Sequence, residues 1–219
     1  MMSKIGVLLS GCGVNDGSEI HEATLAMLAL DRAGAERVCL APDMAQRDVV
    51  NHLTGEPVPE SRNVLVEAAR IARGEIRDLA TVTAAEIDGL ILPGGFGAAK
   101  NLCDFALAGT ETVVNSGVER LLLELHAAGK PIGAICIAPA VLARVFGHLG
   151  AEVTIGNDAG VARILESFGA RHIECPVDDI VVDERLRLVT TPAYMLGPGL
   201  KEIWPGIDKL VQQLMAMAA

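Results

Sequence analysis

The stretch Lys130-Pro131-Ile132-Gly133-Ala134-Ile135-Cys136-Ile137-Ala138-Pro139-Ala140-Val141-Leu142 decides how this chain folds. Its first half is a short apolar run that follows a proline, which is typical of a buried strand. Its second half has the pattern of a helix with a proline in its first turn. The pattern therefore predicts a strand that stops at Cys136 and turns at once into a helix, so that the side chain of Cys136 stands clear of the sheet.

The position of Cys136 suits a nucleophile. Free N–H groups at the start of the following helix favour a thiolate over a thiol, and a lowered pKa of Cys136 is the expectation at such a place. The alternative is a buried cysteine that packs as a small hydrophobic residue, which is the commoner role of a cysteine. The position favours the reactive interpretation.

Strand and helix patterns alternate along nearly the whole chain. Strands are predicted at residues 5–10, 35–41, 76–79, 89–93, 132–136, 152–155 and 172–176, helices at 18–33, 64–73, 114–128, 138–145, 158–168 and 200–217, and a hairpin at 180–183 and 186–191. Ser18 is expected to cap the first helix. The alternation predicts an α/β fold with a doubly wound, mostly parallel, flavodoxin-like sheet and a small antiparallel hairpin.

The composition agrees with this fold. Of the 219 residues, 51% are hydrophobic but only 3% are aromatic, so Ala, Val, Leu and Ile must build the interior, as in a sheet covered on both faces. No linker divides the chain, and we expect one domain over residues 1–219. The polar stretch at about 43–63 is longer than an ordinary α/β connection and is interpreted as a family-specific insertion.

Net charge and cysteine content limit the possible partners and the possible kinds of site. A net charge of −10 argues against a nucleic-acid or anionic-membrane partner and fits small uncharged substrates better. The cysteines are odd in number and form no C-x-x-C or Cys/His pair, so neither a disulfide framework nor a metal site is predicted. They are Cys12, Cys39, Cys103, Cys136 and Cys175. The apolar run at 5–9 is too short for a signal peptide or a membrane span, and we expect a cytoplasmic protein.

Three loops are expected at the carboxyl edge of the sheet, where ligands bind in such folds. They are residues 10–17, residues 93–101 and the turn at Cys136. The backbone N–H groups of Gly95 and Ile137 would flank the cysteine from two loops, as an oxyanion site requires. Glu22 on the first helix could reach the sulfur, but it is explained equally well as an acidic residue at a helix N-terminus.

These residues lie in segments that resemble the PfpI superfamily, which includes the parkinsonism-associated deglycase and has a class I glutamine amidotransferase-like fold. The segments are Gly17-Ser18-Glu19-Ile20-His21-Glu22, Leu92-Pro93-Gly94-Gly95 with the following Gly97-Ala98-Ala99-Lys100-Asn101-Leu102, and Ala134-Ile135-Cys136-Ile137-Ala138-Pro139. Within the superfamily the chain most resembles the ElbB-type glyoxalase, or enhancing lycopene biosynthesis, branch from end to end. Marks of that branch are residues 9–14, 16–20, 51–56, 176–183 and 190–195.

The resemblance implies a Cys136 nucleophile paired with a largely protonated Glu22. It also implies that Gly95 and Ile137, with Gly94 and Asn101, bind the oxyanion or the substrate. The implied activity is a glyoxalase that converts glyoxal to glycolate, or a deglycase acting on glycated amines, without a metal, glutathione or a nucleotide. A homodimer and an indirect role in isoprenoid biosynthesis are further implications.

The chain also departs from the superfamily pattern. Many members place a histidine directly after the cysteine or bring one in from elsewhere, but here Ile137 follows Cys136. His126 and His172 are expected to be surface or packing residues, and His21 should point away from Glu22 because neighbouring residues on a helix diverge. A protease-like triad is therefore not expected.

Three other functions compete with the glyoxalase. A glutamine amidotransferase normally needs a Gly-x-Cys-x-Gly turn, whereas residue 138 is Ala. A redox sensor or chaperone-like protein would use the same cysteine without turnover. The glycines at 11, 13 and 17 only weakly match a dinucleotide loop, because nearby acidic residues would repel a pyrophosphate.

Overall fold

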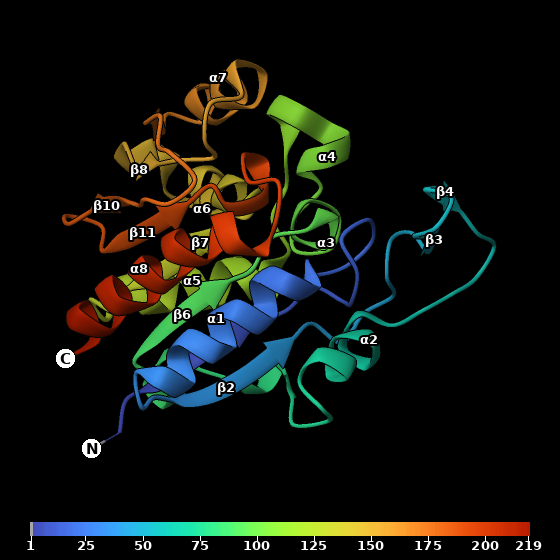
Figure 1. The fold of residues 1–219 in the computed structure, drawn as a ribbon, viewed down its shortest axis with the longest axis horizontal. Coiled ribbons are helices and arrows are strands. Elements are labelled where there is room, and N and C mark those ends of the chain that lie inside the picture. Colours follow the sequence, from blue (N-terminus) through green and yellow to red (C-terminus); the bar gives the residue numbers. More distant parts are fainter. Residues whose placement is uncertain (1) are drawn as a thin grey trace.

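The computed structural model describes residues 2–219, and a seven-stranded sheet forms its centre (Figure 1). Its strands are β1 Lys4–Leu8, β2 Glu36–Ala41, β5 Arg77–Asp78, β6 Gly89–Leu92, β7 Ile132–Ile135, β10 Val181–Asp183 and β11 Leu188–Thr191. They are ordered β10-β11-β7-β6-β1-β2-β5, and only β10 runs antiparallel to its neighbour. The predicted α/β fold, with a mostly parallel sheet and a small antiparallel hairpin, is confirmed.

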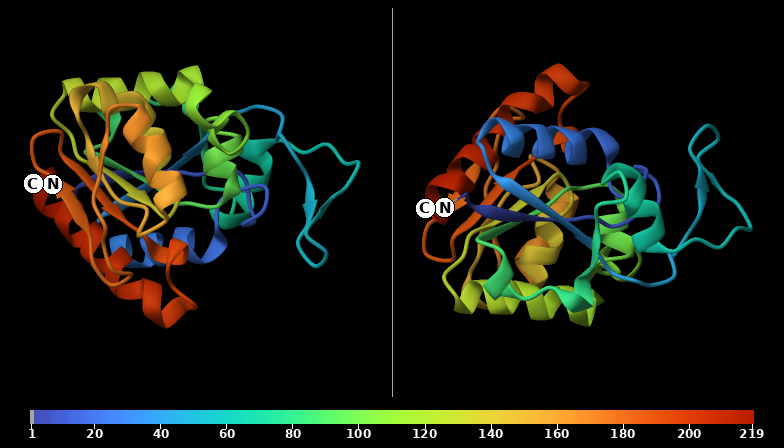
Figure 2. Two further views of the ribbon diagram at one scale, coloured as in Figure 1. Left: turned by 90° about the horizontal axis from the view of Figure 1, so that it is seen from above. Right: turned by 90° about the horizontal axis from the view of Figure 1, so that it is seen from below.

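Helices cover both faces of the sheet (Figure 2). The α-helices are α1 Ile20–Arg32, α2 Val64–Ile71, α3 Phe96–Lys100, α4 Phe105–Ala108, α5 Ser116–Ala127, α6 Pro139–Phe146, α7 Ala159–Ser167 and α8 Leu200–Ala218. Short 3-10 helices are η1 Leu79–Thr81, η2 Ala84–Glu86, η3 Gly109–Glu111, η4 Gly147–Leu149 and η5 Ala193–Met195. One apolar cluster joins α1, α2 and α8 to one face, and a second joins α3 to α7 to the other.

Small residues let the helices approach the central strands. A side chain at Gly133 in β7 would lie 2.9 Å from Leu210 and 3.1 Å from Leu214, both on α8. All four residues of β6 and of β7 are buried, as expected for strands covered on both faces. This packing fixes the carboxyl ends of β6 and β7, where the predicted site lies.

The direction of winding changes between β1 and β6. From β1 the chain proceeds to β2 and β5 on one side, whereas β6 pairs with the other side of β1 and is followed by β7. In an open α/β sheet, the crevice at the carboxyl ends of such neighbouring strands is the usual place for a ligand. The loops after β1, β6 and β7 all open at this edge.

Three details differ from the sequence-based expectations. Glu19, not Ser18, caps α1, because the hydroxyl of buried Ser18 instead accepts a hydrogen bond from the N–H of Ser10 at 2.8 Å. Strands β8 Glu152–Val153 and β9 Arg171–His172 pair in a separate two-stranded sheet. The strand predicted at residues 5–10 ends at Leu8, and α8 continues without a break through Pro205.

Residues 42–63 form an arm that extends away from the sheet (Figures 1 and 2). It carries the antiparallel strands β3 Val50–Asn51 and β4 Glu56–Pro57. Its assignment as an insertion stays a prediction. Within residues 2–219, no helix has the length and apolar character needed to cross a membrane.

Candidate active site

Cys136 occupies a strained turn between β7 and α6. Its backbone φ is +63°, in the left-handed region that non-glycine residues rarely adopt. The N–H of Cys136 donates to the carbonyl of Thr191 in β11 at 2.9 Å, and α6 begins three residues later at Pro139. The predicted strand–cysteine–helix turn is therefore present, with strain of the kind found at functional sites.

Glu22 meets Cys136 from the first turn of α1. The carboxyl group is completely buried and hydrogen-bonds the side chain of Cys136. Its Oε2 accepts from the N–H of Gly94 at 2.9 Å, and its Oε1 accepts from the N–H of Tyr194 at 3.3 Å. Three segments that are distant in sequence thus fix this side chain beside the sulfur.

Burial decides the protonation of Glu22. Removal from water, followed by the negative charge of Glu19, raises the pKa of Glu22 to about 8, against the opposing effect of hydrogen bonds from Tyr194, Cys136 and Gly94. Glu22 is therefore mostly protonated at neutral pH. In that state it has a proton to donate to the sulfur of Cys136.

The thiol does not have the lowered pKa expected from a helix N-terminus. Its side chain is only 8% exposed, and burial, followed by the charge and hydrogen bond of Glu22, raises the pKa of Cys136 well above the ordinary value. The N–H groups of Gly95 and Ile137 act in the opposite direction and are outweighed. Desolvation by the whole fold exceeds the local effect of the turn.

Cys136 and Glu22 consequently titrate as one coupled pair. The charge of Glu22 opposes a thiolate only while Glu22 is ionised, so a thiolate forms most readily beside a protonated Glu22. Because both pKa values are raised, the pair is mostly uncharged at neutral pH, and loss of one proton places a negative charge on the sulfur or on the carboxylate. A nucleophile and a proton donor are both present when the charge lies on sulfur.

The two glycines after β6 allow the backbone to approach this pair. Gly95 has a φ of +90°, and a side chain there would lie 2.4 Å from the backbone nitrogen of Glu19. Its N–H and that of Ile137 face the sulfur from two loops, as predicted for an oxyanion site. Gly94 contributes the N–H that binds Glu22.

Replacement of Gly94 by alanine is expected to separate the pair. The new Cβ would lie 2.5 Å from the Cβ of Cys136 and 2.6 Å from Oε2 of Glu22. We expect a loss of about 1–3 kcal/mol in the free energy of unfolding, typical of overpacking, together with loss of the hydrogen bond between the two side chains. Urea unfolding and the pH dependence of Cys136 alkylation measure the two effects.

The matched control for Gly94 is Gly117→Ala in α5, where the nearest atom would lie at 3.3 Å. That variant should show the alkylation profile of the parent protein and none of the large destabilisation expected for Gly94→Ala. Equal behaviour of the two alanine variants would contradict the steric argument at Gly94.

Asn101 has a structural role in this arrangement. Its Nδ2 donates to the carbonyls of Ser10 at 2.9 Å and Asp16 at 3.0 Å, and its Oδ1 accepts from the N–H of Arg47 at 3.0 Å. Both amide hydrogens are therefore engaged by the loop after β1. These bonds position that loop, and the contact with substrate expected of Asn101 stays a prediction.

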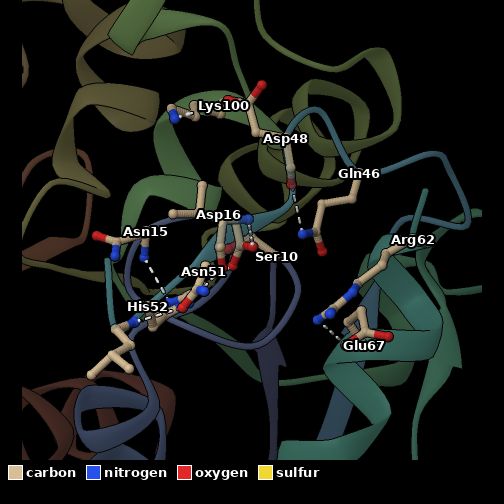
Figure 3. A network of polar contacts seen from close by, with 12 residues as sticks. Ser10, Asn15, Asp16, Gln46, Asp48, Asn51, His52, Arg62, Glu67 and Lys100 are labelled. Carbon is tan, nitrogen blue, oxygen red and sulfur yellow. Dashed lines mark hydrogen bonds and ion pairs between the residues drawn. The ribbon is translucent and has the colours of Figure 1, made fainter. Parts of the chain in front are cut away.

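A polar network fastens the arm to the loop that precedes Glu22 (Figure 3). Oδ2 of buried Asp16 accepts from the N–H of Val50 at 2.7 Å, and Nε2 of His52 accepts from the N–H of Asn15 at 3.2 Å. Lys100 and Asp48 form an ion pair at 2.9 Å. The arm therefore supports one wall of the candidate site.

No hydrogen bond found among residues 2–219 joins a histidine to Cys136 or Glu22. His21 binds the hydroxyl of Tyr194 at 2.7 Å, His126 packs against the ring of Phe146, and His172 accepts from the N–H of Ile155 at 3.3 Å. The packing roles expected for His126 and His172 agree with these contacts.

Sequence reasoning missed Glu19 and Tyr194 as neighbours of Glu22. Glu19 lies one helical turn before Glu22, and Tyr194 follows β11 at the same sheet edge. The position of Tyr194 at the carboxyl edge of the sheet was the one sequence signal that could have predicted its proximity to Glu22. Its backbone N–H, rather than its side chain, makes the contact, and residue type gives no indication of that.

An open groove lies at the opposite end of the sheet, beside β2 and both chain termini. Among its lining residues are Lys4, Glu36, Arg37, Cys39 and Glu75. None of the predicted site residues lines it. Cys136 instead has little exposed surface and lies at the carboxyl edge of the sheet, where the fold places ligands.

Comparison with known proteins identifies similar chains. Residues 12–194 match the DJ-1/PfpI family. The human protein named glutamine amidotransferase-like class 1 domain-containing protein 3, mitochondrial, is 47% identical over 98% of this chain and 83% of its own length. The zebrafish (Danio rerio) ES1 protein, mitochondrial, is 34% identical over 99% of this chain and 87% of its own length.

A solved structure is also similar. An isoprenoid biosynthesis protein with an amidotransferase-like domain from Ehrlichia chaffeensis is 37% identical, with a TM-score of 0.93 over 99% of this chain and 100% of that one.

The names of the relatives contradict the expected cytoplasmic location. Both vertebrate proteins are described as mitochondrial. The expectation was wrong because a chain without a disulfide framework indicates a reducing surrounding and does not specify which reducing compartment.

Proposed function

Because the chain belongs to the DJ-1/PfpI family, whose members include glyoxalases and deglycases, we propose that it is a cofactor-independent glyoxalase that converts glyoxal to glycolate. The observation that carries the proposal is the buried pair of Cys136 and protonated Glu22, flanked by the N–H groups of Gly95 and Ile137. We further propose the ElbB-type branch as its subgroup, in keeping with the likeness to an isoprenoid biosynthesis protein.

The first step is addition of the Cys136 thiolate to one aldehyde carbon of glyoxal. Negative charge moves from sulfur to the former carbonyl oxygen as the C–S bond forms. The N–H groups of Gly95 and Ile137, which face the sulfur, are then available to stabilise the oxygen. Protonation of this oxygen by Glu22 gives a neutral hemithioacetal and leaves Glu22 as a carboxylate.

Glu22 then transfers a proton between the two carbons. Its carboxylate removes the hydrogen from the carbon bonded to sulfur, which gives an enediolate, and returns this proton to the neighbouring carbon, while the hydroxyl proton on the first carbon moves to the oxygen of the second. The product is a glycolyl thioester of Cys136. Water cleaves the C–S bond and releases glycolate, so that glyoxal and one water give glycolate and a proton.

A small substrate fits the access to Cys136. Because only 8% of this residue is exposed, we expect glyoxal to be turned over and a glycated peptide to react poorly or not at all. Glycolate release from glyoxal, lactate release from methylglyoxal and loss of the adduct from a glycated peptide are to be measured on one preparation. Faster processing of the peptide would contradict the glyoxalase assignment and favour a deglycase.

The redox-sensor alternative is less well supported. Oxidation of a cysteine follows its thiolate character and its exposure, and Cys136 is buried with a raised pKa. The predicted homodimer stays a prediction.

A further inference from the structure

The backbone of Gly95 packs directly against the loop after β1. The N–H of Gly95 faces the sulfur of Cys136. A Cβ at Gly95 would lie only 2.5 Å from the carbonyl oxygen of Gly17 and 2.9 Å from the carbonyl carbon of Ser18. The N–H of Gly97 donates to the carbonyl of Gly17 at 2.8 Å. Because the two segments are in such close contact, the position of the Gly95 N–H depends on where the loop lies.

Two side chains join this loop to the arm (Figure 3). Asp16 of the loop is only 3% exposed, and its Oδ2 accepts from the N–H of Val50 in the arm at 2.7 Å. His52 of the arm lies against Gly13, where a Cβ would be 2.5 Å from Nε2 of the imidazole. The same nitrogen accepts from the N–H of Asn15 at 3.2 Å. The arm therefore contacts the loop at two separate points.

Backbone hydrogen bonds within the loop connect both points to Gly17. The N–H of Gly17 donates to the carbonyl of Gly13 at 2.7 Å, and the N–H of Gly13 donates to the carbonyl of Ser18 at 2.9 Å. Asp16 directly precedes Gly17, and its own carbonyl accepts from Nδ2 of Asn101 at 3.0 Å. Each contact with the arm thus reaches the residues that pack against Gly95.

We propose that Asp16 and His52 are positioning residues, which fasten the arm to the loop after β1 and thereby hold the N–H of Gly95 where the oxyanion forms. They act through Gly13 and Gly17 and need no contact with substrate. A donor to an oxyanion is effective only at hydrogen-bond distance, so a small displacement of the loop is sufficient to weaken it. The inference rests on the proposed function, which assigns the Gly95 N–H to the oxygen of the hemithioacetal.

The test compares Asp16→Ala, which removes the acceptor for the Val50 N–H, with Leu53→Ala as the matched control. Leu53 follows His52 in the arm, and it is 94% exposed. Amide hydrogen exchange, followed by mass spectrometry, is measured for the peptide that contains residues 94–97 and for the peptide that contains β7. The values of kcat and KM for glyoxal are determined on the same preparations.

In Asp16→Ala we expect exchange to accelerate at residues 94–97 and to stay unchanged in β7. The increase should be roughly tenfold or more, the effect of losing one hydrogen bond to a charged group. We expect kcat to fall about 10–100-fold with KM unchanged, because the displaced donor acts on charge that develops only after the substrate is bound. Leu53→Ala should match the parent protein in both measurements.

His52→Ala is the second variant, and it decides the question if Asp16→Ala does not fold. The His52 side chain is 38% exposed and belongs to the arm, so its removal should leave the central sheet intact. We expect the same two changes as in Asp16→Ala, each of smaller size, because the bond between Asp16 and Val50 remains.

Three outcomes would overturn the inference. The first is exchange at residues 94–97 that stays at the parental rate in both variants. The second is an equal increase in β7, which would indicate a merely structural role. The third is accelerated exchange with an unchanged kcat in an active protein. Absence of glycolate formation by the parent protein would refute the glyoxalase proposal, and the exchange rates alone would then decide whether the arm positions Gly95.

Discussion

Replacement of Cys136 by alanine is expected to reduce glycolate formation from glyoxal to the uncatalysed rate. Every step after addition requires the C–S bond, so the loss should reach roughly four orders of magnitude or more, as when other covalent enzymes lose their nucleophile. Initial rates of glycolate release, followed by proton NMR, measure it. The variant should still fold, because alanine fits the space that the thiol leaves and adds no group to the buried site.

The matched control is Cys175→Ala. Cys175 is also buried, and burial raises the pKa of its thiol to about 11, but it lies in none of the three loops at the site. Its replacement should leave glycolate formation unchanged. Turnover by Cys136→Ala at the parental rate would contradict the covalent mechanism.

Replacement of Glu22 by glutamine should have the second largest effect. The amide has nearly the same shape but cannot carry a proton from one carbon to the other, so we expect a fall of about 10²–10⁴-fold in kcat, typical of a lost general acid–base. Trapping of the hemithioacetal by mass spectrometry should still succeed, because addition needs only the thiolate. Parental turnover by this variant would exclude Glu22 as the proton carrier.

The same variant should change how stability depends on pH. The pKa of Glu22 is raised to about 8 in the fold from an ordinary value of 4.5, so the folded protein binds more protons than the unfolded chain between these values. Stability from this group is therefore lost as pH rises from about 4.5 to about 8. Relative to the parent protein, Glu22→Gln should gain a few kcal/mol in urea unfolding between pH 5 and pH 9.

A control for this pH dependence is Glu67→Gln in α2, a buried carboxylate whose oxygen lies 2.9 Å from Nε of Arg70. Because this substitution breaks that ion pair, it should not raise the free energy of unfolding. A flat difference between Glu22→Gln and the parent protein across this range would contradict the raised pKa.

Local sequence patterns were sufficient to predict the positions of most residues in this site. The apolar runs before Gly94 and Cys136 identify two central strands, and the carboxyl ends of neighbouring parallel strands must meet at one edge. The position of Cys136 and the two flanking N–H groups follow from these runs. Glu22 became the partner of Cys136 only through the family resemblance, since an acidic residue near a helix N-terminus has an ordinary explanation.

The features that sequence could not provide depend on the whole fold. The pKa of Cys136 is raised because helices and loops from across the chain exclude water, whereas the sequence shows only the local turn that would lower it. The N–H of Tyr194 reaches Glu22 across 172 positions of chain. Glu19 caps α1 in place of Ser18, because the hydroxyl of Ser18 accepts a hydrogen bond from the N–H of Ser10 across the preceding loop. Residue preferences at helix N-termini do not predict such a contact.

The slight exposure of Cys136 also affects how long the protein stays active. A sulfur with so little exposed surface hinders peptide-sized disulfides, which must align three sulfur atoms for exchange, more than it would hinder the proposed two-carbon aldehyde. Its raised pKa further slows capture by such disulfides at neutral pH. The same enclosure that restricts the substrate therefore shields the thiol from mixed-disulfide inactivation in a cell rich in small thiols.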